Sequence, residues 1–194
     1  MSSVSESRSP LPTVDLARTV VFAAFIAVLG IFPGIYVGGS SVPIVIQNAG
    51  PLLAGSILGA RRGAASVVLF LGLVAIGLPL LSGGRGGIAS FSVPSSGFLI
   101  GWVLSALVAG LIVSRARRVG LPVLLLANAA GLAADYLIGI PFLGVYIGDL
   151  PAAALQSLIF VPGDLVKVVA AALIAGVVHR ALPGLSARPA TRTG

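Results

Sequence analysis

The sequence has no cysteine, one histidine, one lysine and few charged residues of any kind. Without cysteine the chain can form neither a disulfide nor a thiolate metal site. It contains no Gly-x-x-x-x-Gly-Lys-Ser/Thr segment, which excludes ATP hydrolysis by a P-loop. It also has no His-Glu-x-x-His motif and no Cys/His cluster, which excludes a zinc protease. No internal repeat with paired broken helices stands out, and this weakens the case for a transporter that works alone. We therefore expect a protein that is not an enzyme and has no metal.

What the sequence has in excess is apolar residues. Hydrophobic residues make up 57% of the chain and charged residues 9%, whereas about 25% of the residues of a soluble domain are charged. This composition indicates an integral membrane protein that contacts the lipid bilayer. A chain of 194 residues has room for about six membrane-spanning helices and little else.

Six apolar segments each approach the ~20 residues that a helix needs to cross ~30 Å of hydrocarbon. We expect an all-α membrane protein with six transmembrane helices and with Gly-rich loops outside the cell. The segments are about residues 16–32, 45–58, 64–81, 97–113, 121–139 and 152–178. The flanking parts predict a disordered cytoplasmic tail over 1–14, a membrane domain over 15–182 and a second cytoplasmic tail over 183–194.

Positive charge is distributed asymmetrically over these segments. In a six-span arrangement only Arg85 falls on one side. The other side carries Arg8, Arg18, Arg61, Arg62, Arg115, Arg117, Arg118, Arg180, Arg188 and Arg192. Because cytoplasmic loops are rich in Lys and Arg, both termini are expected in the cytoplasm. The topology accounts for the net charge of +7 without a nucleic-acid partner. It also places His179 at the cytoplasmic edge, where it cannot be the base of an intramembrane serine protease.

The last apolar segment carries two opposite charges. Asp164 and Lys167, the only lysine, are three residues apart and therefore share a helix face. A charge at the bilayer centre costs roughly 2.5 kcal/mol or more and marks a candidate functional site. At ~1.5 Å per residue from His179, Lys167 lies roughly 18 Å towards the outside. Pro162 and Gly163 can kink the helix or begin a new one, which would widen the outer half of the bundle. A purely structural ion pair is the alternative.

Other polar residues lie at a similar outer depth. The loop over 81–98 is rich in glycine and serine, and its hydroxyls can bond a polar solute or belong to an ordinary connector. Gln47 and Asn128 can contact a ligand or form interhelical hydrogen bonds. Asp135 can pair with Lys167 or Arg85. Ala23 and Ala27 on the first segment form a small-x-x-x-small face that lets another helix approach closely.

Several motifs then occur in a fixed order. They are Ser41–Gln47 with Leu53–Ala64, Ile76–Pro79 with the Gly-rich loop, Pro94–Trp102, and Phe160–Lys167. Over residues 15–180 the chain resembles the BioY family, the biotin-specific S components of energy-coupling factor (ECF) transporters. The resemblance implies a six-helix fold, capture of biotin from outside and no ATPase in the chain. It also implies two kinds of partner, a transmembrane coupling subunit and two cytoplasmic ATPases. The coupling subunit is expected to dock at Ala23 and Ala27.

From this resemblance we predict a high-affinity biotin-binding subunit of an ABC-type importer, a multi-pass protein of the plasma membrane with no cofactor. Asp164 and Lys167 match the family's biotin site. The further expected contacts are Gln47, Ser90, Phe91, Ser92, Phe98, Asn128, Tyr136 and Tyr146. The chain departs from the family pattern at Ser95, Phe98 and Asp135. Two alternatives stay open: an S component for thiamine or riboflavin, and a membrane scaffold without transport activity.

Overall fold

The computed structural model describes residues 11–38 and 40–182, and in these ranges it is helical without strands. The helices are α1 (Leu11–Leu29), α2 (Ala49–Leu58), α3 (Ala60–Ala75), α4 (Ser96–Arg115), α5 (Leu121–Ile147), α6 (Leu150–Ser157) and α7 (Val161–Ala181), with short 3₁₀ helices η1 (Ile88–Phe91) and η2 (Leu158–Phe160). Because α6, η2 and α7 follow one another directly, they form one helical segment, Leu150–Ala181. The expected all-α fold is confirmed for the described residues.

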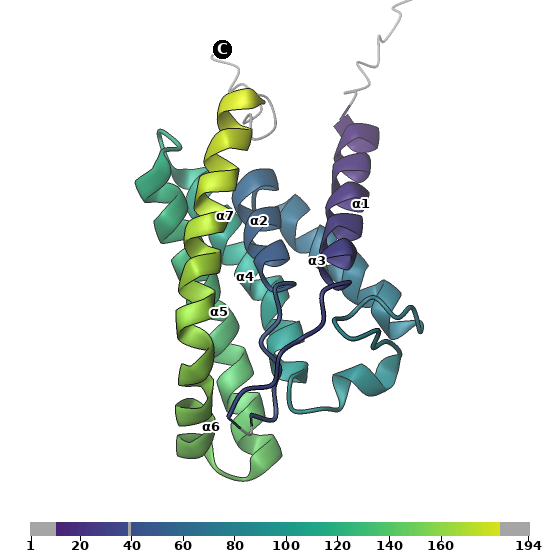
Figure 1. The fold of residues 1–194 in the computed structure, drawn as a ribbon. Helices are drawn as coiled ribbons and strands as arrows, with labels where there is room; N and C mark the ends of the chain where they lie inside the picture. Colours follow the sequence, from purple (N-terminus) through teal and green to yellow (C-terminus); the bar gives the residue numbers. More distant parts are fainter. Residues whose placement is uncertain (1–10, 39, 183–194) are drawn as a thin grey trace, which may run out of the picture.

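Three segments of the described chain are long and apolar enough to cross a membrane: α4, α5 and Leu150–Ala181. Large apolar side chains on the outer faces of these segments are exposed, including Leu137, Val145, Leu165 and Val166. Such surfaces are costly in water and suit contact with lipid tails. Figure 1 shows that the start of α1 and the end of α7 lie at the same end of the bundle.

Several boundaries differ from the sequence expectation. Helix α1 already begins at Leu11, so residues 11–14 are helical rather than part of a tail. A proline at position 12 is compatible with this start, because N–H groups in the first turn of a helix have no partner within the helix. The rest of the two predicted tails, 1–10 and 183–194, lies outside the described residues. Helix α3 ends at Ala75 rather than near 81. Helix α5 continues beyond 139, through Pro141, to Ile147, where Gly148 ends it in a left-handed conformation.

The largest difference from the sequence expectation is in the second apolar segment. Helix α2 has 10 residues and begins at Ala49 rather than 45, so it rises only about 15 Å. Residues Gly50–Leu58 are all buried. The chain reaches α2 through a non-helical stretch, which at membrane depth is tolerated only where protein covers it or where it lines a cavity.

Helix α4 is the centre of the bundle, packed against α2, α3 and α5. Glycine permits the closest approaches. A Cβ added to Gly55 would lie 2.2 Å from the carbonyl oxygen of Ala106, and one on Gly110 would lie 2.3 Å from the backbone nitrogen of Ala60. The backbones of neighbouring helices are therefore in contact, as small residues permit in membrane proteins.

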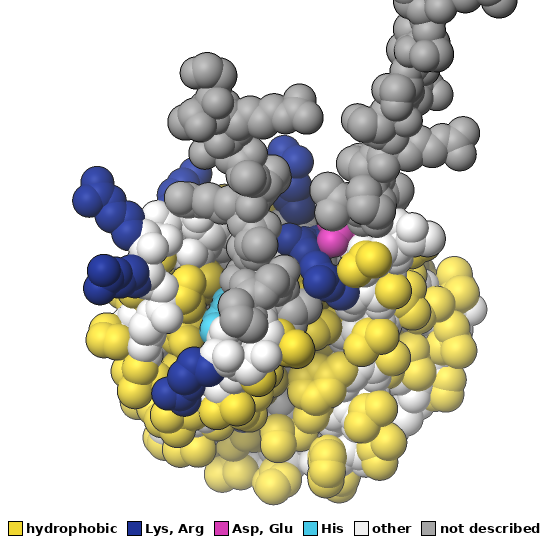
Figure 2. Space-filling model, turned by 90° about the horizontal axis from the view of Figure 1, so that it is seen from above, with side chains coloured by type: hydrophobic (Ala, Val, Ile, Leu, Met, Phe, Trp, Pro, Cys, Tyr) yellow, Lys and Arg dark blue, Asp and Glu magenta, His cyan; other side chains and the backbone are white. Residues whose placement is uncertain are grey.

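Arginine gathers at one end of the bundle. Figure 2 views this end and shows basic side chains around it, with hydrophobic side chains over the flank. The arginines there stand near the start of α1, at the start of α3, at and after the end of α4, and at the end of α7. They are Arg18, Arg61, Arg62, Arg115, Arg117, Arg118 and Arg180.

Candidate ligand-binding site

A pocket lies where α2, α4 and α7 begin, so it is at the opposite end of these helices from the arginines. Its walls also include α5 and the two connections that precede α2 and α4. Its empty volume is about 560 Å³, counting space open to solvent. The lining residues are Val42, Pro43, Ile44, Val45, Gln47, Asn48, Leu81, Ser82, Arg85, Ser95, Phe98, Trp102, Asp135, Tyr136, Phe160, Asp164 and Lys167. The non-helical stretch before α2 is thus a wall of the pocket.

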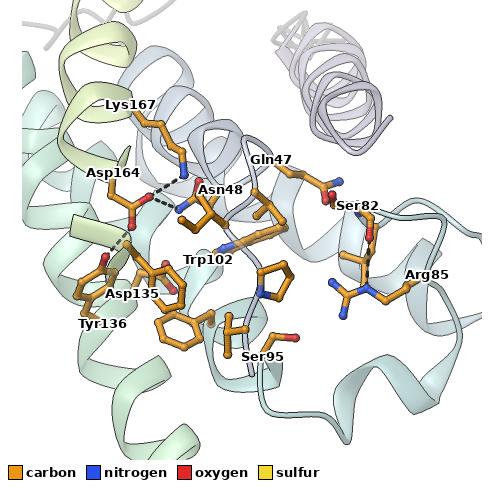
Figure 3. A pocket seen from close by; sticks show the side chains of 17 residues that line it. Gln47, Asn48, Ser82, Arg85, Ser95, Trp102, Asp135, Tyr136, Asp164 and Lys167 are labelled. Atoms are coloured by element: carbon orange, nitrogen blue, oxygen red, sulfur yellow. Dashed lines mark hydrogen bonds and ion pairs between the residues drawn. The ribbon is translucent and has the colours of Figure 1, made fainter. Parts of the chain in front are cut away.

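Asp164 is the hub of a polar cluster on one side of the pocket (Figure 3). Its Oδ1 accepts hydrogen bonds from Lys167 Nζ at 2.7 Å and from Asn48 Nδ2 at 3.1 Å. Its Oδ2 accepts one from the Tyr136 hydroxyl at 2.6 Å. The side chains of Asp164 and Lys167 are 3% and 13% exposed. The predicted ion pair is therefore confirmed, and it joins α7 to the start of α2 and to α5.

The start of α7 explains the position of this pair. Helix α7 begins at Val161 and has Pro162 in its first turn, directly after the 3₁₀ turn of η2 within the continuous segment Leu150–Ala181. Asp164 consequently lies in the first turn of α7. The positive end of the helix dipole at this position favours a negative charge.

Asp135 is the second carboxyl group in the pocket. It is 3% exposed, and its Oδ1 has no hydrogen-bond partner. The two partners suggested by the sequence are engaged elsewhere: Lys167 binds Asp164, and Arg85 Nε donates to the carbonyl oxygen of Ser82 at 3.2 Å. Neither of the two possible pairings of Asp135 forms in this structure. Gly101 leaves room for the Asp135 carboxyl because glycine has no side chain: a Cβ added to Gly101 would lie 2.3 Å from Asp135 Oδ1.

Gln47 lines the pocket, but its side-chain amide forms hydrogen bonds with the backbone. Its Nε2 donates to the carbonyl oxygens of Ile26 at 3.0 Å and Leu80 at 2.8 Å, and its Oε1 accepts from the N–H of Ser82 at 3.0 Å. Ile26 lies in the last turn of α1, where carbonyl groups have no partner within the helix. Gln47 therefore ties the end of α1 to the connection between α3 and α4.

Aromatic rings form the apolar part of the wall. Phe98 makes edge-to-face contacts with Tyr136 and Phe160, with ring centroids 6.1 Å apart in both pairs. Trp102 lines the pocket one turn further along α4 and is 4% exposed. Phe98 and Tyr136, two of the expected contacts, line the pocket, and their contact with a ligand stays a prediction. Trp102 and Phe160 line it without having been predicted as contacts.

Five other predicted contacts do not line this pocket. The Ser90 hydroxyl donates to the carbonyl oxygen of Gly86, and Phe91 packs into the core between α1, α3 and α4. Ser92 is exposed, as is Tyr146, at 53%. Asn128 is fully buried, and its Nδ2 donates to the carbonyl oxygen of Leu124 in its own helix. The turn of η1 folds the serine-rich loop back on itself, which composition does not reveal.

The structure also brings in residues that the predicted list lacked: Asn48, Ser82, Arg85, Ser95, Trp102, Asp135 and Phe160. A usable signal existed for Asn48, which is polar and adjacent to Gln47, and for Asp135, an acidic residue within an apolar segment. Arg85, alone on its side of the charge distribution, was also a recognisable candidate. Ser82 and Ser95 belong to the serine-rich loop, and Trp102 and Phe160 carry no such signal.

The expected docking face on α1 is partly occupied within the chain. Ala23 is 2% exposed and packs in a core cluster with Ile26 and Phe70. Ala27 is partly buried against the same cluster. The docking role of these two residues stays a prediction.

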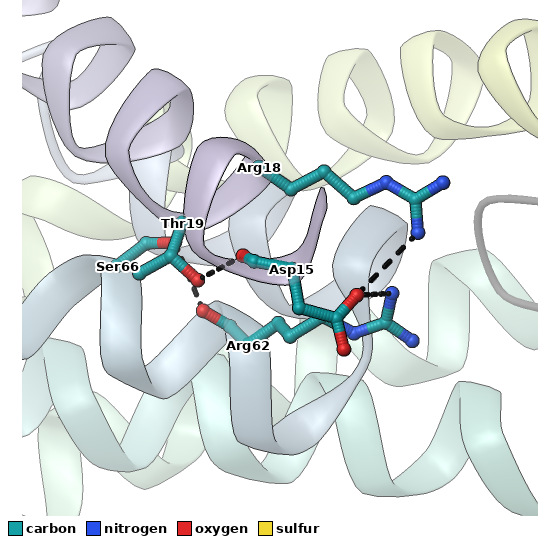
Figure 4. A network of polar contacts seen from close by, with 5 residues as sticks. All are labelled: Asp15, Arg18, Thr19, Arg62 and Ser66. Carbon is teal, nitrogen blue, oxygen red and sulfur yellow. Dashed lines mark hydrogen bonds and ion pairs between the residues drawn. The ribbon is translucent and has the colours of Figure 1, made fainter. Parts of the chain in front are cut away.

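Nearer its start, α1 is fixed to α3 by an ion pair. Asp15 Oδ1 lies 3.1 Å from Arg62 Nη1 and 3.7 Å from Arg18 Nη1 (Figure 4). The side chains of Asp15 and Arg62 are 41% and 25% exposed. A pair this open to its surroundings contributes at most about 1 kcal/mol.

Known proteins resemble this chain over nearly its whole length. A family model described as the BioY family matches residues 3–184. The chain is 43% identical over 186 residues to the biotin transporter BioY of Rhizobium etli, covering 92% of this chain and 100% of that protein. It is 45% identical over 179 residues to the biotin transporter BioY of Rhodobacter capsulatus, covering 84% and 92%.

Among solved structures, the chain is similar to the S-component for biotin from an ECF-type ABC transporter. The TM-score is 0.79 at 33% sequence identity, covering 87% of this chain and 92% of that one. With its apolar helices, this is a membrane protein. The resemblance that the motifs indicated is confirmed, and the chain belongs to the BioY family.

Proposed function

We propose that this protein is the high-affinity biotin-capture subunit, or S component, of an ECF-type ABC importer. The observation that carries the proposal is the polar cluster around Asp164 on one wall of an otherwise largely apolar pocket. Two curated relatives named as biotin transporters, and a structural neighbour described as an S-component for biotin, support the same ligand.

Biotin fits the chemistry of this pocket. It has a neutral bicyclic ureido head with two N–H groups and one carbonyl oxygen, and an aliphatic chain that ends in a carboxylate. Lys167 uses one N–H on Asp164 and, as an ammonium, keeps two donors that can reach a carbonyl oxygen. The rings of Phe98, Trp102 and Phe160 offer apolar surface for the bicyclic head.

Six spans with both termini in the cytoplasm account for the charge distribution. The arginines at one end of the bundle correspond to the cytoplasmic side by the positive-inside rule. The pocket, at the opposite ends of α2, α4 and α7, then faces outwards, and the Gly-rich loop over 81–98 is extracellular. We propose the plasma membrane as the location of the protein.

Transport requires partners, because the sequence has no P-loop. We propose that a transmembrane coupling subunit and two cytoplasmic ATPases supply energy, as the resemblance implies. Docking through Ala27 needs little rearrangement, since this residue is only partly buried. Docking at Ala23 requires α1 to separate from the core cluster that it shares with α3.

Ligand binding and uptake test the proposal together. We expect purified protein to bind biotin in isothermal titration, and to restore biotin uptake to an auxotroph only when the coupling subunit and ATPases are co-expressed. Binding of thiamine or riboflavin without biotin would establish a different vitamin specificity. No ligand binding and no rescue would favour a scaffold.

Arg85 supplies a test of how the ligand lies. It lines the pocket across from Asp164 and Lys167 (Figure 3), where a cation can attract the carboxylate of biotin. We expect Arg85→Gln to weaken biotin binding about tenfold, which corresponds to about 1.4 kcal/mol. Affinity for biotin carboxamide, which is neutral, should not change. Arg118→Gln, at the far end of the bundle, is the matched control. An equal loss for both ligands would contradict a carboxylate contact.

A further inference from the structure

Asp135 is a carboxyl group that the protein buries but does not use. It lines the pocket on the same side as Asp164 and Tyr136 (Figure 3). Within residues 11–38 and 40–182 its side chain has no hydrogen bond and no ion pair. Burying a carboxyl without a partner is among the costlier arrangements in a protein. A donor from outside the chain would remove that cost.

Asn128, on the same helix, shows that burial alone does not make a site. Its Oδ1 also has no partner, but its Nδ2 is bonded to the carbonyl oxygen of Leu124, and it does not line the pocket. Asp135 differs because it lines a space where a ligand can enter. The evidence for a binding role is therefore that the unpaired carboxyl of Asp135 lines the pocket, and not only that it is unpaired.

Asp164 is poorly placed to accept the donors of a ligand. Its two oxygens already receive hydrogen bonds from Lys167, Asn48 and Tyr136, and an ionised carboxylate has about four acceptor positions in all. Asp135 has all of its acceptor positions free. An entering N–H group therefore gains more at Asp135 than at Asp164.

We infer that Asp135 accepts a hydrogen bond from a ureido N–H of the bound ligand and so determines which end of the ligand enters this side of the pocket. The inference rests on the proposed function. The negative charge of Asp164 beside Asp135 disfavours a carboxylate, and Asp135 keeps acceptor capacity for N–H donors whether or not it is protonated. It therefore orients the ureido head towards Asp135 and the carboxylate towards Arg85. Asp164 is a positioning residue, because it holds Lys167 in place for the ureido oxygen.

This arrangement also produces selectivity. A site that leaves a buried acceptor unpaired rejects ligands that lack the matching donor. We expect ligands without a cyclic N–H group to bind poorly even when their ring and chain fit the apolar walls.

Titration of the full-length protein with biotin and two analogues tests the inference. Each analogue carries a methyl group on one of the two ureido nitrogens. In the wild type, one analogue should bind about 10- to 100-fold more weakly than the other, because its N–H is the one that reaches Asp135. Asp135→Ala should weaken biotin binding by a similar factor and remove most of the difference between the analogues. Asn128→Ala should retain both the affinity and the difference.

A second measurement is the thermal unfolding of the protein without ligand. The variant for this measurement is Asp135→Asn, because the amide has the same shape as the carboxyl. Asp135→Asn should unfold at the same temperature as the wild type or higher. A lower temperature would reveal a structural partner and overturn the inference, as would wild-type biotin affinity in both Asp135 variants. If the wild type itself binds no biotin, the proposed function fails as well, so the two failures are distinguishable.

Discussion

Asp164→Ala is expected to lower both the stability of the protein and its affinity for biotin. The change leaves the Lys167 ammonium, 13% exposed, without its counter-charge, and leaves the Asn48 amide and Tyr136 hydroxyl without an acceptor. Breaking a buried ion pair by removing one partner costs about 3–5 kcal/mol. Thermal unfolding should show a lower midpoint, and titration should show biotin affinity reduced at least about 100-fold.

A double variant separates contact with the ligand from mutual positioning. Asp164→Leu combined with Lys167→Met removes both charges at similar volume, and replacing a whole buried pair in this way is often neutral or stabilising. We expect the unfolding temperature to recover while biotin binding stays lost. Recovery of binding would show that the pair only holds the fold together. Asp15→Asn, which removes the charge of a much more exposed pair, should leave binding unchanged.

Gln47→Leu is expected to have the second large effect, mainly through the fold, because the Gln47 amide is bonded to the backbone. Leucine fills the volume but leaves the carbonyl groups of Ile26 and Leu80 and the N–H of Ser82 without their partner. Each unsatisfied buried group costs about 1–3 kcal/mol. Thermal unfolding should therefore report a loss of about 3 kcal/mol or more. Biotin binding should weaken because the wall that includes Leu81, Ser82 and Arg85 loses its anchor.

Gln156→Leu is the matched control for this prediction. The Gln156 side chain has no hydrogen bond within the described residues, so the same substitution removes nothing. We expect wild-type stability and affinity. Equal destabilisation by the two substitutions would contradict the role of Gln47 as a link between α1 and the connection before α4.

The charged pair was predictable from sequence because two rare residue types, at helical spacing in an apolar segment, have few alternative explanations. Asp164 and Lys167 do meet at 2.7 Å. Arg85 and Asp135 carried the same kind of signal, a charge in an unexpected place. Their partners were not predictable, because pairing depends on which helix faces are opposed and sequence spacing describes only one helix at a time.

The serine-rich loop shows the opposite case. Its composition suggested a ligand contact, but the hydroxyl of Ser90 serves a backbone carbonyl four residues back. The Ser96 hydroxyl similarly bonds the carbonyl oxygens of Ser90 and Val93. Local hydrogen bonds of this kind are available to every serine, so composition cannot distinguish a loop that binds a solute from one that binds itself. The start of α2 was predicted at 45 rather than 49 for a related reason, since an apolar wall and an apolar helix have the same composition.

Lys167 has a practical consequence for laboratory work. Reagents that couple to amines are widely used to attach proteins to surfaces, to add fluorophores and to cross-link complexes. This chain offers them one side-chain amine, and that amine lines the pocket. A protein immobilised or labelled through this lysine would have a blocked binding site, and bound ligand should protect the lysine from modification. Protection from an amine-reactive dye therefore gives a direct measure of pocket occupancy without any engineered probe.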